Sequence, residues 1–273
     1  MRPPRPRTFP NEPSPRMTRH TSALAALVLF VSLGACSRGP ETPQDLLAQM
    51  LARYSANRGA VGGFVVTGGG AEATHAALPD STSDLAPPAI APVGGEQPRA
   101  EALGLLAQQI PNVRLLAQRL RSAEMEGPRD LRGHRVYILT GAPETPGAPT
   151  LYVVVDAETL DVREIEQSVA ADTLDRPLIT RLVYDDFRTA DGLTLPFRVR
   201  QINEGVDQLI PQTERMVRGA QLSVSRGQID LLPPGREREE RREALDRELR
   251  LYTDGVQETE LRVDRVRVTP RSR

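Results

Sequence analysis

The sequence predicts an α+β fold in which one antiparallel sheet packs against a small number of helices. Two observations near the N-terminus support this class: apolar residues recur at helical spacing over 41–57 and again over 99–124. A third comes from the region after residue 135, where short β-rich segments follow one another with turns between them and no helices. Strands at such short spacing pair as an antiparallel meander, because a parallel crossover needs a dozen or more residues.

The first expected helix covers residues 41–57. Its apolar residues fall on one broad face, and Thr42-Pro43 at its start is typical of an N-cap residue followed by proline in the first turn. A strand is expected next, over 61–67. The following 71–98 segment is expected to be a flexible insertion, because small residues, proline and glycine dominate it. Such a segment buries too little apolar surface to offset the entropy lost on ordering.

Two further helices are expected over 99–109 and 112–124, separated by Pro111, which cannot continue a helix. Their leucines form one stripe, which predicts that both helices pack onto the sheet. Strands are then expected over 136–140, 151–156, 162–169, 178–187, 193–202 and 212–224.

A tight hairpin is expected at Asp191-Gly192, because this pair readily supplies the positive φ angles of a two-residue reversal. Apolar and polar residues alternate along 193–199, so one face of that strand is buried. Pro196 lies inside it and lacks a backbone N–H. We therefore expect this strand to be an edge strand or locally irregular.

The C-terminal part begins with a strongly charged helix over 236–252, in which opposite charges lie four residues apart. A solvated helix face is the expected interpretation, and a partner-binding surface is the alternative. A closing strand covers 259–269. Its apolar residues change from odd to even positions near Asp264-Arg265, which predicts a β-bulge there.

The first residues indicate a targeting segment. Residues 17–20 form a short positive region, and the apolar run 23–33 has the length of a signal peptide. That run is too short to span a bilayer, which takes roughly 20 residues. The sequence Leu-Gly-Ala-Cys at 33–36 then resembles the lipobox of bacterial lipoprotein signal peptides. The resemblance implies that residues 1–35 are removed, with Met17 as an alternative start of translation.

Cys36 is the expected lipidation site. It is the only cysteine of the chain, so no internal disulfide is possible, and an exported protein would otherwise carry one reactive thiol. Ser37, rather than Asp, follows it. By resemblance to enterobacterial lipoproteins, this residue favours anchoring in the outer membrane, facing the periplasm, with the inner membrane as the alternative.

Charge and motif content narrow the class of function. Removing residues 1–35 takes away five of the 35 arginines and one of the 36 acids, which leaves a net charge of about −5. That sign disfavours a nucleic-acid partner. No Gly-x-Ser-x-Gly elbow, His-Glu-x-x-His motif or phosphate loop occurs. His75 and His134 lack nearby ligand partners, so we expect no catalytic residues, no metal and no cofactor.

Three segments carry a resemblance to a known family. They are 124–139 with its Gly-x-Arg-x-Tyr strand start, 151–156, and 181–198 with its Asp-Gly-Leu-x-Leu-Pro hairpin. In this order they are similar to the LolA/LolB-like proteins of outer-membrane lipoprotein sorting. The resemblance implies that residues 36–273 form one domain, an incomplete antiparallel β-barrel with N-terminal and inserted helices, whose concave apolar side accepts acyl chains.

The expected function is therefore a lipid-anchored envelope protein that holds acyl chains or lipoprotein cargo in an apolar cavity. Candidate lining residues are those expected to alternate inward: Tyr152, Val154, Leu193, Leu195 and Phe197. The alternative is a scaffold or regulatory, stress-sensing lipoprotein that binds another envelope protein without a cavity. An open apolar pocket of roughly several hundred Å³ favours the first function, and a filled interior favours the second.

Overall fold

A computed structural model describes most of the chain after the expected signal peptide. It covers residues 39–59, 61–76, 88–93, 98, 100–142, 145, 148–170 and 173–270. Residues 42–273 form one compact unit, separate from 1–41, and every helix and strand described below belongs to it. Cys36 and the expected signal peptide lie outside the described residues.

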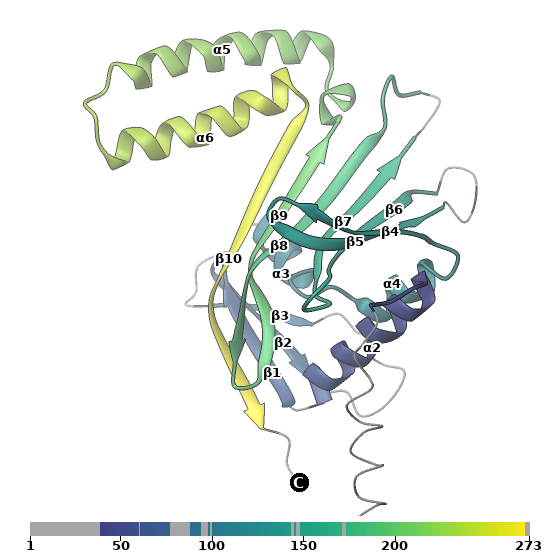
Figure 1. The fold of residues 1–273 in the computed structure, drawn as a ribbon. Coiled ribbons are helices and arrows are strands. Elements are labelled where there is room, and N and C mark those ends of the chain that lie inside the picture. The colour runs from purple at the N-terminus through teal and green to yellow at the C-terminus, as the bar shows by residue number, and fades with distance from the viewer. Residues whose placement is uncertain are drawn as a thin grey trace, which may run out of the picture. The chain divides into compact units, whose positions relative to one another are not determined.

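The described strands form one open, ten-stranded sheet in which every neighbouring pair is antiparallel (Figure 1). This confirms the α+β class and the antiparallel pairing. The strands are β1 (Val61–Gly68), β2 (Ala71–Ala76), β3 (Ala89–Pro92), β4 (Glu124–Leu131), β5 (His134–Gly141), β6 (Thr150–Asp156), β7 (Val162–Val169), β8 (Leu178–Ala190), β9 (Leu193–Glu204) and β10 (Val256–Pro270).

The order in the sheet is β3-β2-β1-β10-β9-β8-β7-β6-β5-β4. Strands β4 to β9 are the expected meander. The last strand, β10, lies between β1 and β9 and joins the N-terminal strands to that meander. Along its pairing with β1, Thr67 faces Arg265 whereas Gly68 faces Val263, so Asp264 is the extra residue of the predicted β-bulge.

Three helices cover one face of the sheet: α2 (Pro43–Gly59), α3 (Ala100–Ala107) and α4 (Val113–Arg119) (Figure 1). The start of α2 is fixed by a reciprocal cap, in which Thr42 Oγ1 accepts from the Asp45 N–H and an Asp45 carboxylate oxygen accepts from the Thr42 N–H, each at 3.1 Å. Leucines from all three helices are buried against the sheet, as their spacing predicts.

Strands β9 and β10 are connected by a helical hairpin, made of η1 (Val206–Leu209), α5 (Gln212–Asp230) and α6 (Arg236–Thr253). Helix α6 confirms the charged helix expected over 236–252. The strand expected over 212–224 is wrong, because those residues lie in α5. Their apolar residues recur at helical spacing, and the hydroxyls of Ser223 and Ser225 bond to backbone carbonyls four residues earlier, within the helix.

The insertion over 71–98 is more regular than its composition predicts. Residues 71–76 pair with β1 along their whole length as β2, and β3 pairs with β2. Ala71 and Ala73 are fully buried, so small side chains here allow close packing beneath α3. The expectation of an unstructured segment is therefore wrong for these two strands, because an existing strand supplies the backbone partners. Residues 77–87 and 94–97 lie outside the described residues.

The helix expected over 112–124 ends at Arg119, and residues 124–131 form the edge strand β4 instead. Nearly all of β4 is exposed, so it lacks the apolar alternation that marks a strand. Pro128 is tolerated there because an edge strand has a free side. The same reasoning is confirmed at Pro196, because β9 pairs with β10 only from Arg198 onward and is therefore a local edge at the proline.

The helical hairpin is fixed to the sheet by the carboxylate of Asp207, which is 9% exposed. It accepts from Arg176, which precedes β8, and from Nη1 of Arg215 in α5 at 2.9 Å. Gly255 lies against this carboxylate at the start of β10 with φ of +67°, and a Cβ there would come within 1.9 Å of Asp207 Oδ1. Only glycine fits both the backbone and the space at this position.

Replacing Gly255 by alanine should therefore destabilise the protein. The left-handed backbone alone costs about 1–3 kcal/mol for a residue with a Cβ, and the clash with Asp207 adds to it. The free energy of unfolding, measured by urea denaturation, checks this. Gly104→Ala in α3 is the matched control, because a Cβ there meets nothing within 4 Å. It should leave stability unchanged or raise it by up to about 1 kcal/mol, and an equal loss in both variants would contradict the assignment.

Candidate functional site

An apolar pocket lies where α2 and the α3–α4 corner meet the hairpin of β8 and β9. The β6–β7 turn closes one side of it. Its lining comes from five separate parts of the chain, namely Met50, Arg53, Tyr54, Ile110, Pro111, Val113, Leu160, Asp161, Val162, Phe187, Leu193, Thr194, Leu195 and Pro196. Most of these side chains are apolar. The pocket is therefore suited to a hydrocarbon rather than to a polar ligand.

The pocket is small in this structure. Its free volume is about 50 Å³, whereas pockets that enclose small-molecule ligands typically measure roughly 300–1,000 Å³. One continuous apolar core connects α2, α3, α4 and strands from both parts of the sheet. A ligand larger than a few atoms enters the pocket only if the helices move away from the sheet. A second, more open hollow of about 640 Å³ lies between β3 and α3, lined by Ile90, Ala91, Pro92, Pro98, Ala100 and Leu103.

Two charged groups lie among the apolar lining residues. Asp161 and Arg53 both line the pocket. Burial raises the pKa of the Asp161 carboxyl, although a hydrogen bond within the turn and the charges of Arg53 and Arg163 act in the opposite direction. The pocket thus combines an apolar interior with one group of each charge, a pattern that suits an amphiphile whose polar end stays near water.

The turn that carries Leu160 and Asp161 is held by Asp156, which is 5% exposed. Its Oδ1 accepts from the backbone N–H groups of Glu158 and Thr159 at 3.0 Å each, and its Oδ2 accepts from Arg163 at 2.8 Å. Burial alone would raise the pKa of Asp156, but these bonds outweigh it and lower the pKa below its ordinary value.

The α3–α4 corner is attached to the sheet by two polar contacts. Nε2 of Gln109, which is fully buried, donates to the Pro196 carbonyl at 2.6 Å, and the Tyr184 hydroxyl donates to the Gln108 carbonyl at 3.2 Å. Burial raises the pKa of Tyr184, so this hydroxyl remains a donor. Strand β10 does not pair with β9 at Pro196. The Pro196 carbonyl is therefore available to the helix corner, which bonds directly to the strand there.

Two of the five residues expected to line a cavity do line this pocket, namely Leu193 and Leu195, and they are 0% and 2% exposed. Phe197 packs at the margin of the core, with the Arg188 guanidinium 4.8 Å from its ring centroid, and does not contact the pocket. Tyr152 is 36% exposed, and Val154 is buried outside the main core.

The inward direction expected for Tyr152 and Val154 is wrong. Leu151, Val153 and Val155 of the same strand join the main core, so the alternate residues face the other side of the sheet. The run from Leu151 to Val155 is apolar on both faces. The sequence therefore has no alternation that would indicate which of these side chains face the core. The pocket residues that sequence reasoning missed include Ile110 and Phe187, which lie at the ends of an expected helix and an expected strand. Their periodicity indicates a buried face but not that the two faces meet at one pocket.

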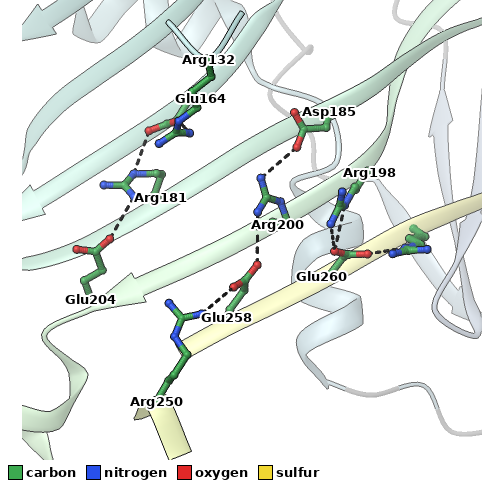
Figure 2. Close-up of polar contacts among 11 residues, drawn as sticks. Arg132, Glu164, Arg181, Asp185, Arg198, Arg200, Glu204, Arg250, Glu258 and Glu260 are labelled. Atoms are coloured by element: carbon green, nitrogen blue, oxygen red, sulfur yellow. Dashed lines mark hydrogen bonds and ion pairs between the residues drawn. The ribbon is translucent and has the colours of Figure 1, made fainter. Parts of the chain in front are cut away.

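The opposite face of the sheet carries ion pairs that run across β7, β8, β9 and β10 (Figure 2). Arg181 bonds to Glu164, Glu166 and Glu204 at 2.8–3.1 Å. In a second group, Arg200 bridges Asp185 and Glu258, and Arg250 at the end of α6 reaches Glu258; in a third, Glu260 is held by Arg198 and Arg262. This face is charged and balanced, so it is unsuited to bind hydrocarbon.

Among the described residues, no helix is long and apolar enough to cross a bilayer, and no cluster of three His, Cys, Asp or Glu residues has a geometry that suits a metal ion. Comparison with known proteins returned no matching family model, no matching curated protein and no matching solved structure.

Replacing Asp156 by asparagine should lower the free energy of unfolding by about 1–3 kcal/mol at neutral pH, because the charge-assisted bonds that shape the pocket turn are lost. The folded-state pKa is lowered, so the advantage of the carboxylate is present above its ordinary value of 3.8 and is lost as the pH falls through and below that value. Urea denaturation at a series of pH values measures this.

Asp161→Asn is the matched control, because Asp161 lies in the same turn and its side chain takes no part in the bonds made by the Asp156 carboxylate. Burial raises the pKa of Asp161, so its ionised form is disfavoured in the folded protein. The neutral amide should leave stability at neutral pH unchanged or slightly higher. A larger loss for Asp161→Asn than for Asp156→Asn would contradict these roles.

Proposed function

We propose that this protein is a lipid-anchored envelope protein with a LolA-like half-barrel, which holds acyl chains or lipoprotein cargo between its sheet and its helices. The proposal places it at the outer membrane, facing the periplasm. One observation carries it: the pocket formed by α2, the α3–α4 corner and the β8–β9 hairpin is apolar inside and has a charged residue of each sign in its lining.

The helices that cover the sheet are suited to movement. Helices α3 and α4 have eight and seven residues, and isolated helices shorter than roughly 12–15 residues are marginal in water. Their position therefore depends on leucines packed against the sheet, such as Leu105, Leu106 and Leu116. An acyl chain that enters the pocket replaces those contacts with equivalent ones and gains about 0.8 kcal/mol for each CH₂ that it buries.

The charged residues in the lining define the kind of ligand. A hydrocarbon chain buried among Met50, Ile110 and Phe187 leaves its polar end near Arg53 and Asp161. Arg53 suits an anionic head such as a carboxylate or a phosphate. The small volume of the closed pocket fits a site that excludes water when no ligand is bound.

A single tryptophan placed in the pocket tests ligand entry, because the chain has none of its own. In residues 42–273 carrying Phe187→Trp, dibromostearate should quench the emission in a saturable way, since bromine quenches only at short range. Fluorescence titration with dibromostearate, against unbrominated stearate as reference, measures it.

Leu115→Trp is the matched control, because Leu115 lies on α4, is 43% exposed and does not line the pocket. Its emission should remain unquenched over the same concentrations. Equal quenching in both variants would indicate unspecific surface binding, and no quenching in either would rule out acyl-chain binding.

The anchor is tested separately by metabolic labelling. Full-length protein produced in a bacterial host should incorporate radiolabelled palmitate, and Cys36→Ala should abolish the label because no other thiol is present. Ser37→Ala should keep it. Palmitate on the Cys36→Ala chain, or none on the natural chain, would contradict lipidation at this cysteine.

The second candidate is a scaffold or regulatory lipoprotein that binds a protein partner and no lipid. The closed state of this pocket favours it, because a free volume of about 50 Å³ holds no acyl chain unless the helices move. Organic extraction of the purified protein followed by mass spectrometry separates the two. Co-purifying lipid supports the first candidate, and its absence together with unquenched Phe187→Trp supports the second.

A further inference from the structure

Helix α5 has one face that packs within the chain and one that does not. Its inner side carries the buried Leu222 and packs against α6, on the far side of α6 from the sheet (Figure 1). Its arginines point the same way, since Arg218 pairs with Glu248 and Arg226 pairs with Asp246 of α6. The charges of α5 are therefore used largely within the hairpin, and the outer side of the helix is left to solvent.

The outer side carries a regular apolar seam. Its residues are spaced alternately four and three apart, which is the a/d pattern of a coiled coil. Valines 217 and 224 and Leu231 on this seam are 59%, 64% and 86% exposed, and the adjacent Met216 is 69% exposed. No seam position is charged. We call this set the α5 seam: Thr213, Val217, Ala220, Val224, Gly227 and Leu231.

The sizes of the seam residues alternate. Val217, Val224 and the C-cap residue Leu231 are the larger residues, whereas Ala220 and Gly227 between them are small. Thr213, at the start of the seam, is close to valine in size. Gly227 is notable because glycine weakens a helix interior, yet a Cβ there would meet nothing within 4 Å in this chain. Among the described residues nothing requires a residue without a side chain at this place, and Gly219, elsewhere in α5, has the same open space.

We propose that the α5 seam binds the α5 seam of a second copy of this chain, with the two helices antiparallel about a two-fold axis that crosses the outer side of α5 midway between Ala220 and Val224. Antiparallel coiled coils set a positions against d positions. Val217 and Val224 then each face a small residue of the other copy, and Leu231 faces threonine. The pairs are Val217 with Gly227, Val224 with Ala220, and Leu231 with Thr213, and each pair occurs twice.

This size matching favours a second copy over other occupants. A parallel pairing would place large residues against large ones and small against small, which leaves gaps in alternate layers. A helix that lies on a membrane carries basic residues beside its apolar face, whereas here Gln221, Ser223 and Gln228 border the seam and the nearby arginines are paired with α6. Self-pairing also meets no charge repulsion along the seam.

The contact is short. Helix α5 has 19 residues, and one helix pair of this length buries less than the roughly 800 Å² per partner of a standard stable interface. We therefore expect a dimer that forms and dissociates with concentration in the micromolar range.

Sedimentation of residues 42–273, the compact unit that contains every described helix and strand, tests the dimer. The natural sequence should change from monomer to dimer as concentration rises, and Val224→Glu should remain monomeric. Leu209→Glu is the matched control, since Leu209 is 61% exposed but lies on η1 outside the seam, and it should dimerise like the natural sequence. The natural sequence and both variants should have the same circular dichroism spectrum.

Cysteine cross-linking tests the direction of pairing, because residues 42–273 contain no natural cysteine. Val217→Cys with Gly227→Cys in one chain should give disulfide-linked dimers on oxidation, whereas Val217→Cys alone should not. The two positions lie about 15 Å apart within one helix, too far for an internal disulfide, which needs Cα atoms within about 7 Å. Cross-linking by Val217→Cys alone would overturn the antiparallel arrangement.

Gly227→Leu separates an interface role from a structural one. A Cβ at this position has open space within the chain, and leucine favours a helix more than glycine does, so the monomer should melt at the same or a slightly higher temperature. The dissociation constant of the dimer should rise at least several-fold, because Val217 of the other copy then faces a leucine in place of glycine. A natural sequence that stays monomeric at every concentration would overturn the proposal, and co-flotation of that monomer with phosphatidylglycerol vesicles would assign the seam to a bilayer.

Discussion

The fold depends on the double pairing of β10. This last strand hydrogen-bonds to β1 on one side and to β9 on the other, and it thereby joins the strands that precede the covering helices to the long meander that follows them. Strands β1 to β3 are rich in small residues and would be marginal as an isolated sheet. Once β10 holds them, one continuous face is available on which α2, α3 and α4 bury their leucines. Strand β10 thus completes the face on which the core forms.

Local signals predicted the local features of this fold. The cap at Thr42, the reversal at Asp191-Gly192 with φ angles of +48° and +84°, and the bulge at Asp264 each depend on a few neighbouring residues, and each is present as expected. Strand spacing was enough to predict the antiparallel meander. These features could be read from the sequence because their physical causes lie within a few residues of one another.

Features that depend on distant segments were not predictable in the same way. Strands β2 and β3 form because β1 offers backbone partners to β2, and β2 to β3, which overrides the composition of that segment. Helix α5 is a different case, because the helical spacing of its apolar residues is present in the sequence and the strand expected there was a wrong interpretation. The pocket is the clearest case, since Ile110, Asp161 and Leu195 come from three parts of the chain and meet only through the tertiary fold. The inward orientation of Leu193 and Leu195 could be predicted from the strict alternation along β9. The apolar run around Val154 does not alternate, so it does not indicate which of its side chains face the core.

The helical hairpin has a further consequence for how this architecture can vary. Glu204 and Val256 are direct partners in the β9–β10 ladder, so the chain leaves the sheet and returns to it at neighbouring points. A short reversal could connect these residues and leave every strand pairing unchanged. The hairpin is therefore an insertion at one end of the β9–β10 pair, and its length and outer surface are independent of the strand register.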